Sequence, residues 1–221
     1  MIKHKDDNQK CKGRRPARVA VTGGIGSGKT LVCQHLQKKG IVVISADELS
    51  RLAVAPGTRA YKKIFDHFGE RVILPDKSIN RQKLRRIISS SPEAKKTLES
   101  FIHPEVFRQM AERVELAAQN GEDLVVVEVP LLFESGFDAW FDVVVMVSVD
   151  RERRIARIMT RDEISREDAE SMMKIQMSEG EKRRRADFVI DNNNTKEQTL
   201  SSVDRLYDHL MQISEKRDEK S

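Results

Sequence analysis

The chain has 221 residues, a length that suits one substantial core with inserted subdomains better than two ordinary independent domains. Hydrophobic residues make up 38% and charged residues 34%, a globular composition that excludes extensive disorder. The net charge of +5 comes from residues 1–18, where seven Lys and Arg outnumber two Asp, while the remainder balances at 33 basic against 33 acidic residues. Because the body is neutral, we expect no nucleic-acid partner.

The first element in chain order is a basic tail, residues 1–17. It lacks the apolar run of a secretory signal, and we interpret it as a disordered, solvated extension. No later run approaches the roughly 20 apolar residues of a membrane span, so no membrane partner is expected. The two cysteines, Cys11 and Cys33, provide neither a disulfide framework nor metal-ligand spacing. These features favour a cytoplasmic protein, either a monomer or a small homo-oligomer. A short C-terminal tail is expected at residues 215–221.

Short runs rich in β-branched residues recur along the chain, and each ends at Gly, Pro, Asp or Asn. Their near-continuous apolarity predicts strands buried on both faces of a parallel sheet. Helical patterns alternate with them, so we predict an α/β protein, a three-layer sandwich built on a five-stranded sheet. The runs are ARVAVTG, GIVVISAD, EDLVVVEVP, FDVVVMVSVD and ADFVIDNNN. The predicted core takes residues 18–55, 122–150 and 186–214.

Two intervals depart from the alternation of strand and helix. Residues 56–121 contain no core-strand pattern and are far longer than an ordinary crossover, which predicts a helical insertion. Residues 151–185 are helical and rich in arginine, and we interpret them as a lid. Within the insertion His103 stands beside Pro104; this pair marks a kink or a helix start, or His103 is a catalytic group.

The stretch TGGIGSGKTL follows the first strand and opens the first helix. It satisfies the phosphate-binding pattern G-x-x-x-x-G-K-[ST] in the context that the pattern requires. Glycines allow the backbone N–H groups to surround a phosphate chain, and the helix N-terminus adds partial positive charge. Lys29 is predicted to reach the β- and γ-phosphates of a nucleoside triphosphate, and Thr30 to bind Mg²⁺. A glycine turn without a ligand is the less favoured alternative.

The class of nucleotide-binding protein is narrowed by sequence motifs that the chain lacks. No N-K-x-D guanine reader and no L-S-G-G-Q-like signature is present, which disfavours a GTPase and an ABC-type ATPase. Asp47 follows the second strand, where it would face the phosphate loop and orient an acceptor hydroxyl; alternatively, it caps the next helix. Glu128 ends the third strand and would contact Mg²⁺ through water, or is a solvated acid.

Arginines of the lid recur at helical spacing. Arg153, Arg157 and Arg161 lie four residues apart, with Arg154 alongside, and this predicts a guanidinium stripe. An anion facing the stripe would relieve its repulsion, as the charge on a transferring phosphoryl group would. The alternative is an exposed face neutralised by neighbouring acids.

In this order the motifs resemble the dephospho-CoA kinase family. The similar stretches are VTGGIGSGKT, VISADELSR, IHPEV, VEVPLLFESG, TRDEISREDAE and DFVIDNN, spread over residues 18–212. The resemblance implies ATP-dependent phosphorylation of the ribose 3′-hydroxyl of dephospho-CoA with Mg²⁺, the last step of coenzyme A biosynthesis. It also implies that the insertion binds the acceptor and that the arginine segment closes over ATP.

The resemblance assigns roles to particular positions. Asp47 is the expected base, acting with Lys29, Arg157 and Arg161, and the metal site is assigned to Thr30 and Glu128. Substrate contacts are assigned to Asp47, His103 and Leu131. The nucleotide-binding residues are expected to be Gly24, Ile25, Gly26, Ser27, Gly28, Lys29, Thr30, Leu31, Arg153 and Asn192. Two alternatives stay open: a kinase of another small acceptor, such as a nucleoside monophosphate, and a non-catalytic P-loop ATPase.

Overall fold

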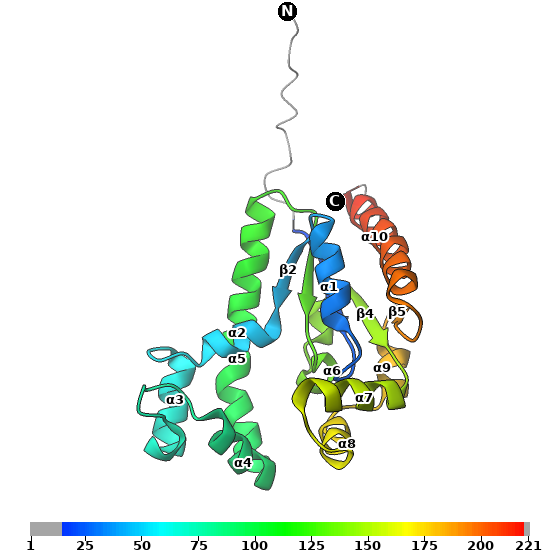
Figure 1. The fold of residues 1–221 in the computed structure, drawn as a ribbon. Helices are drawn as coiled ribbons and strands as arrows, with labels where there is room; N and C mark the ends of the chain where they lie inside the picture. Colours follow the sequence, from blue (N-terminus) through cyan, green and yellow to red (C-terminus); the bar gives the residue numbers. More distant parts are fainter. Residues whose placement is uncertain (1–14, 219–221) are drawn as a thin grey trace, which may run out of the picture. The chain divides into compact units, whose positions relative to one another are not determined.

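The computed structural model describes residues 15–218, so the predicted basic tail up to residue 14 lies outside the described residues. Contacts divide the chain into two compact units (Figure 1). One comprises the chain up to Ile44 and from Val114 onward, and the other is Ser45–Arg113. The predicted insertion, 56–121, therefore overlaps most of the second unit in sequence, but it begins and ends later along the chain.

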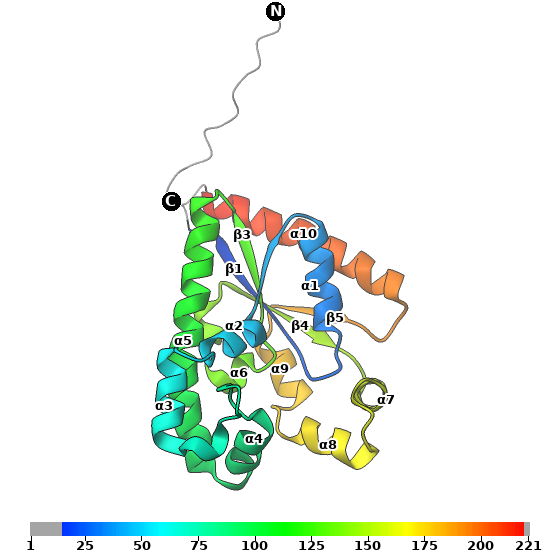
Figure 2. The same cartoon turned by 60° about the vertical axis from the view of Figure 1, so that its left-hand side comes forward.

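The first unit is built on the predicted five-stranded parallel sheet. Its strand order is β2-β3-β1-β4-β5, which places the strand that leads into the phosphate loop at the centre (Figure 2). β1 pairs with β3 from Ala17↔Leu124 onward and with β4 from Val19↔Val143 onward. The strands are β1 Ala17–Thr22, β2 Val42–Ser45, β3 Leu124–Glu128, β4 Val143–Ser148 and β5 Phe188–Asp191.

Helices cover both faces of this sheet. Along β1, Val19 and Val21 enter a core shared with α1 (Lys29–Lys38) and α10 (Lys196–Asp218), whose Leu36 and Leu210 are fully buried. Ala20, between the two valines, is also fully buried and points to the opposite face. The fourth strand contacts α9 (Glu179–Arg185). The three-layer prediction is confirmed, although α10 runs through the start of the expected C-terminal tail.

The segment predicted as a lid forms three helices, α7 (Arg151–Asp162), α8 (Arg166–Lys174) and α9. α7 and α8 pack around Ile155, Ile158 and Ala169, which are almost fully buried. A capping box begins α9. The Ser178 hydroxyl accepts a hydrogen bond from the Glu181 N–H, and the Glu181 carboxylate accepts one from the Ser178 N–H.

The second unit has a hydrophobic core of its own. α3 (Arg59–Phe68) and α5 (Pro92–Gln119) contribute Ile64, Phe68 and Leu98 to it. α5 is continuous through His103 and Pro104, so this pair does not start a new helix. The unit also contains α2 (Ala46–Ala53), α4 (Arg81–Ser90) and a 3₁₀ turn, Glu70–Val72.

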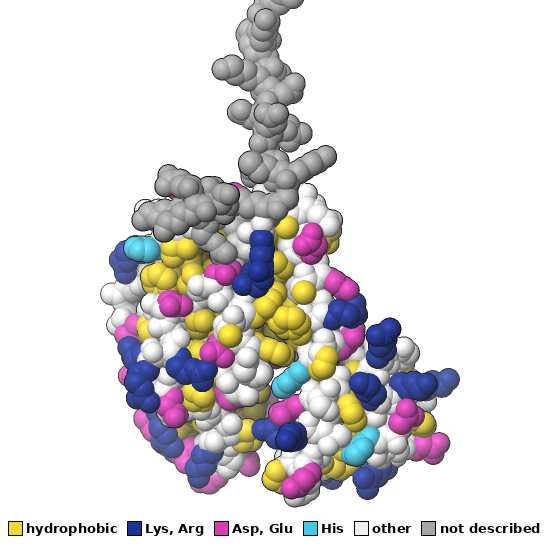
Figure 3. All heavy atoms as spheres, turned by 180° about the vertical axis from the view of Figure 1, so that it is seen from behind, with side chains coloured by type: hydrophobic (Ala, Val, Ile, Leu, Met, Phe, Trp, Pro, Cys, Tyr) yellow, Lys and Arg dark blue, Asp and Glu magenta, His cyan; other side chains and the backbone are white. Residues whose placement is uncertain are grey.

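The distribution of charge on the surface is relevant to the nucleic-acid and membrane partners considered above. Basic and acidic side chains are interspersed over the described part of the face drawn in Figure 3. This mixture agrees with the balanced charge of the chain beyond residue 18. Among the described residues no helix combines the length and the apolar character that crossing a bilayer requires.

Candidate active site

The phosphate loop joins β1 to α1 and depends on its glycines. Gly28, the N-cap of α1, has a φ of 96°, in the left-handed region that favours glycine. A Cβ at Gly28 would come within 2.2 Å of Asn192 Nδ2, so the position is closed to a side chain for a second reason. Lys29 is only 8% exposed, and its Nζ donates to the carbonyl oxygens of Gly23 and Gly24 at 3.0 and 3.1 Å.

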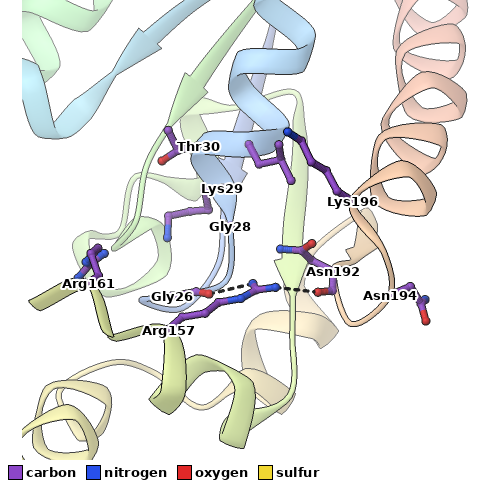
Figure 4. A pocket seen from close by; sticks show the side chains of 10 residues that line it. Gly26, Gly28, Lys29, Thr30, Arg157, Arg161, Asn192, Asn194 and Lys196 are labelled. Atoms are coloured by element: carbon purple, nitrogen blue, oxygen red, sulfur yellow. Dashed lines mark hydrogen bonds between the residues drawn. The ribbon is translucent and has the colours of Figure 1, made fainter. Parts of the chain in front are cut away.

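A pocket of about 410 Å³ opens beside this loop (Figure 4). Three segments of the first unit form it: the loop with the start of α1, the middle of α7, and the loop after β5. Its lining residues are Gly26, Gly28, Lys29, Thr30, Leu31, Arg157, Arg161, Asn192, Asn194 and Lys196. Eight of these are sequence-predicted site residues, while Asn194 and Lys196 were not predicted. Their only signal is their place just after Asp-Asn-Asn, a run that begins at the last residue of β5.

The arginine stripe divides into different environments. Arg157 enters the pocket, where its Nη1 donates to the Gly26 carbonyl at 3.2 Å and its Nη2 to the Asn192 carbonyl at 3.4 Å. Arg161 also lines the pocket and forms a 2.7 Å ion pair with Asp162. That pair raises the pKa of Arg161, mainly through its hydrogen bond to the carboxylate, and keeps the guanidinium charged.

The remaining arginines of the stripe do not line the pocket. Arg153 donates to the carbonyl of Asn193, in the loop after β5, and stays exposed. Arg154 is 7% exposed, and its guanidinium lies where a Cβ of Gly24 would be, 2.1 Å from Nη2. Arg154 is thus a buried support behind the phosphate loop, which the stripe did not predict.

The predicted metal residues lie together. Thr30 Oγ1 donates to Glu128 Oε1 at 3.1 Å, across the gap between the start of α1 and the end of β3. A hydroxyl beside a carboxylate is an oxygen donor set of the kind that Mg²⁺ uses with nucleotide phosphates, completed by water. The two residues therefore fit Mg²⁺. Among the described residues no cluster of three His, Cys, Asp or Glu side chains could hold a metal by itself.

Asn192 fastens the loop after β5 to the phosphate loop. Its side chain is 4% exposed, and its Nδ2 donates to the Ser27 carbonyl at 2.7 Å. Its Oδ1 accepts a hydrogen bond from Thr199 Oγ1 at 3.0 Å, which fixes the orientation of the amide. Because both ends of the amide are engaged, Asn192 holds one wall of the pocket at a set distance from the loop.

The predicted acceptor residues mostly lie in the second unit. Asp47 is exposed in the first turn of α2. The cap of that helix is Ser45, whose hydroxyl accepts the Glu48 N–H at 3.3 Å. The capping role considered for Asp47 is therefore wrong, and its carboxylate stands at the positive end of α2. His103 lies within α5 and is half-buried.

The other predicted residues lie outside the pocket lining. Leu131, in the first unit, precedes α6 (Leu132–Ser135) and is 45% exposed. Ser27 is buried within the phosphate loop and is bridged to Asn192 through its carbonyl. Gly24 faces Arg154, and the Ile25 side chain packs against the core of α7 and α8.

The parallel sheet and the glycine loop with its Lys-Thr pair define a P-loop nucleotide-binding protein. The sequence profile described as dephospho-CoA kinase matches residues 17–198. The chain belongs to the dephospho-CoA kinase family.

Individual relatives agree with this assignment. A dephospho-CoA kinase of Bacillus licheniformis is 38% identical over 190 residues, covering 86% of this chain and 94% of the relative. A solved Thermus thermophilus protein has a TM-score of 0.78 at 31% identity, covering 89% of this chain and 99% of its own. The dephospho-CoA kinase from Campylobacter jejuni has a TM-score of 0.66 at 29% identity, with 90% and 98% covered.

Proposed function

We propose that this protein transfers the γ-phosphoryl group of ATP to the ribose 3′-hydroxyl of dephospho-CoA and so completes coenzyme A biosynthesis. The observation that carries the proposal is a pocket combining Lys29 and Arg157 at a glycine loop, in a chain of the dephospho-CoA kinase family. We expect the reaction in a reducing cytoplasm, which suits the free buried thiol of Cys33.

The phosphate loop would hold the triphosphate of ATP through the N–H groups at the start of α1. Lys29 would exchange its bonds to the Gly23 and Gly24 carbonyls for the β- and γ-phosphates. Arg157 and Arg161 would neutralise the charge that spreads over the γ-phosphoryl oxygens during transfer. The loop after β5, with Asn192, would form the wall beside the nucleoside.

Thr30 and Glu128 are the residues that would hold Mg²⁺. When bound, the ion would neutralise phosphate charge and keep the donor oxygens in a fixed arrangement. Thr30 contributes its hydroxyl oxygen, while Glu128 accepts a hydrogen bond from that hydroxyl and is placed to accept another from metal-bound water. The two side chains thus orient each other before any ligand is present.

The second unit, Ser45–Arg113, would bind the acceptor. Asp47 would accept a hydrogen bond from the 3′-hydroxyl, align its oxygen with the γ-phosphorus and take its proton as the new bond forms. His103 and Leu131 would contact other parts of dephospho-CoA. Closure of residues 151–185 over ATP would exclude water that otherwise hydrolyses it.

The test measures ADP release with Mg·ATP and dephospho-CoA, in parallel with AMP, CMP and no acceptor. Release that requires dephospho-CoA and yields coenzyme A supports the proposal. Release that prefers a nucleoside monophosphate supports the kinase of another acceptor, and acceptor-independent release supports an ATPase.

The role of Asp47 is tested by Asp47→Asn, with Glu48→Gln as the matched control. Both residues are exposed carboxylates in the first turn of α2. Asp47→Asn should lower kcat by about 100-fold or more with little change in the KM for ATP, because the base acts only during transfer. Glu48→Gln should leave kcat near that of the natural protein. A near-normal kcat for Asp47→Asn would remove Asp47 from the role of base.

A further inference from the structure

One residue of the phosphate loop, Ile25, is held on three sides by the lid segment. Its side chain packs against the buried residues of α7 and α8, Ile155 and Ile158 among them. Its N–H donates to Gln176 Oε1 at 2.8 Å, and its carbonyl accepts from Arg154 Nε at 3.0 Å. Both polar backbone groups of this loop residue are thus satisfied by side chains far away in the sequence.

Arg154, which donates to the Ile25 carbonyl, is itself held by further polar contacts. Its Nη1 pairs with Glu179 Oε2 at 3.2 Å, and Glu179 also accepts a hydrogen bond from the Ser148 hydroxyl at the end of β4. Arg183 donates to the same Ser148 hydroxyl at 2.8 Å. The guanidinium of Arg154 is therefore part of a partly buried polar network that holds it against the phosphate loop.

Gln176, which accepts from the Ile25 N–H, lies between α8 and α9 in a segment that is hydrogen-bonded to α6. The N–H of the next residue, Met177, donates to Glu134 Oε1 at 2.8 Å. Lys182 is 1% exposed, and its Nζ lies 2.9 Å from the same oxygen. Because the Glu134 carboxylate anchors Met177 and Lys182, Gln176 is held in place independently of the phosphate loop.

We propose that Gln176 is a positioning residue for the phosphate loop. Its amide oxygen fixes the Ile25 peptide, so that the N–H groups that follow, from Gly26 to Thr30, are already oriented for a phosphate chain before ATP arrives. Gln176 is absent from the pocket lining and acts through Ile25. The role rests on the proposed use of ATP, and it makes the segment after α8 a determinant of donor affinity rather than of acceptor binding.

The test compares Gln176→Met, which keeps the length of the side chain but removes the acceptor, with Gln176→Glu, which keeps an acceptor oxygen at the same reach. The control is Gln212→Met on an exposed position of α10. Three quantities are measured: the Kd of ADP by calorimetry, the KM for ATP and the KM for dephospho-CoA. The melting temperature of each variant reports its folding.

Gln176→Met should raise both the Kd of ADP and the KM for ATP by about 10-fold, because an unpaired Ile25 N–H leaves the loop free to reorganise. The KM for dephospho-CoA should stay within about 2-fold, and Gln176→Glu should recover most of the lost ADP affinity. Gln212→Met should match the natural protein in every measurement.

Unchanged ADP affinity in a folded Gln176→Met variant would overturn the proposal, as would an equal rise in both KM values or no recovery with Gln176→Glu. If Gln176→Met does not fold, Gln176→Asn takes its place, since the shorter amide cannot reach Ile25. ADP binding does not depend on the acceptor. The positioning role therefore stands or falls separately from the assignment of dephospho-CoA as substrate.

Discussion

Replacing Glu134 by Gln tests whether the buried Lys182 depends on its partner. Lys182 has only 1% of its side chain exposed, against 21% for Glu134, and their charged atoms lie 2.9 Å apart. Removing one charge of a fully buried pair costs about 3–5 kcal/mol, and the partial exposure of Glu134 reduces this to about 2–3 kcal/mol. Lys182→Met should cost less, about 1 kcal/mol, because Glu134 keeps water and the Met177 N–H.

The assay is urea unfolding followed by circular dichroism, with the melting temperature as a second measure. For a chain of this size, about 2–3 kcal/mol corresponds to a loss of roughly 4–12 °C. Glu134→Gln should therefore be clearly less stable than Lys182→Met. If Lys182→Met proves the more damaging change, or if Glu134→Gln costs nothing, the argument from an unpaired buried charge is refuted.

The same pair predicts a pH dependence. Burial alone would raise the pKa of Glu134, but the Lys182 ammonium and the Met177 N–H outweigh it and hold the pKa below the ordinary value of 4.5. A carboxyl whose pKa is lower in the folded state stabilises the fold fully above its unfolded pKa. That contribution is lost as the pH falls through the folded pKa. The stability gap between the natural protein and Glu134→Gln should therefore narrow below about pH 4.5.

Three further predictions concern the pocket. Gly28→Ala should abolish measurable ADP binding in calorimetry and cost about 1–3 kcal/mol, because φ is 96° and the new Cβ would meet Asn192; normal binding would contradict this. Thr30→Val should raise the Mg²⁺ concentration needed for half-maximal rate by roughly 10-fold, and an unchanged Mg²⁺ titration would exclude Thr30 as a ligand. Arg157→Ala should lower kcat/KM for ATP by about 100-fold or more, and a loss under 3-fold in steady-state rates would speak against the arginine.

The sheet was predictable because the strands are almost continuously apolar and each is followed by a turn residue. That pattern arises only where both faces of a strand are covered, so it gives the parallel arrangement as well as the strand positions. The phosphate loop was predictable for a related reason. Its geometry requires glycine at fixed spacing, followed by a lysine and a hydroxyl residue, and Gly23, Gly28, Lys29 and Thr30 meet this requirement.

The different environments of the α7 arginines, with Arg154 buried and Arg157 in the pocket, could have been predicted in part. Arg154 and Ile158 are four residues apart and share a face of α7, and Ile158 is fully buried. A guanidinium on an apolar stripe is more consistent with a buried support than with a phosphate ligand. The position of Ser178 and Glu181 likewise matches a capping box, which signals that α8 ends before α9 begins.

Other parts of the site leave little local signal. Gln176 contacts Ile25 across 151 positions, Asn194 lies in the polar loop after β5, and Lys196 is the first residue of α10. Nothing in the spacing of such residues records a contact that exists only after the chain has folded. The sequence can point to a loop that binds phosphate, but the residues that steady the loop are specified by tertiary packing.

The two separate cores bear on how the protein loses function when heated. Val19 and Leu36 belong to the core under the sheet, whereas Ile64 and Phe68 belong to the smaller core of the second unit. A smaller core buries less surface and tends to open at lower temperature. We expect nucleotide binding to outlast phosphoryl transfer on heating, so that the partly melted protein still retains ADP after it no longer makes product. An inactivation curve would then describe the second unit, and only ligand binding would report on the sheet.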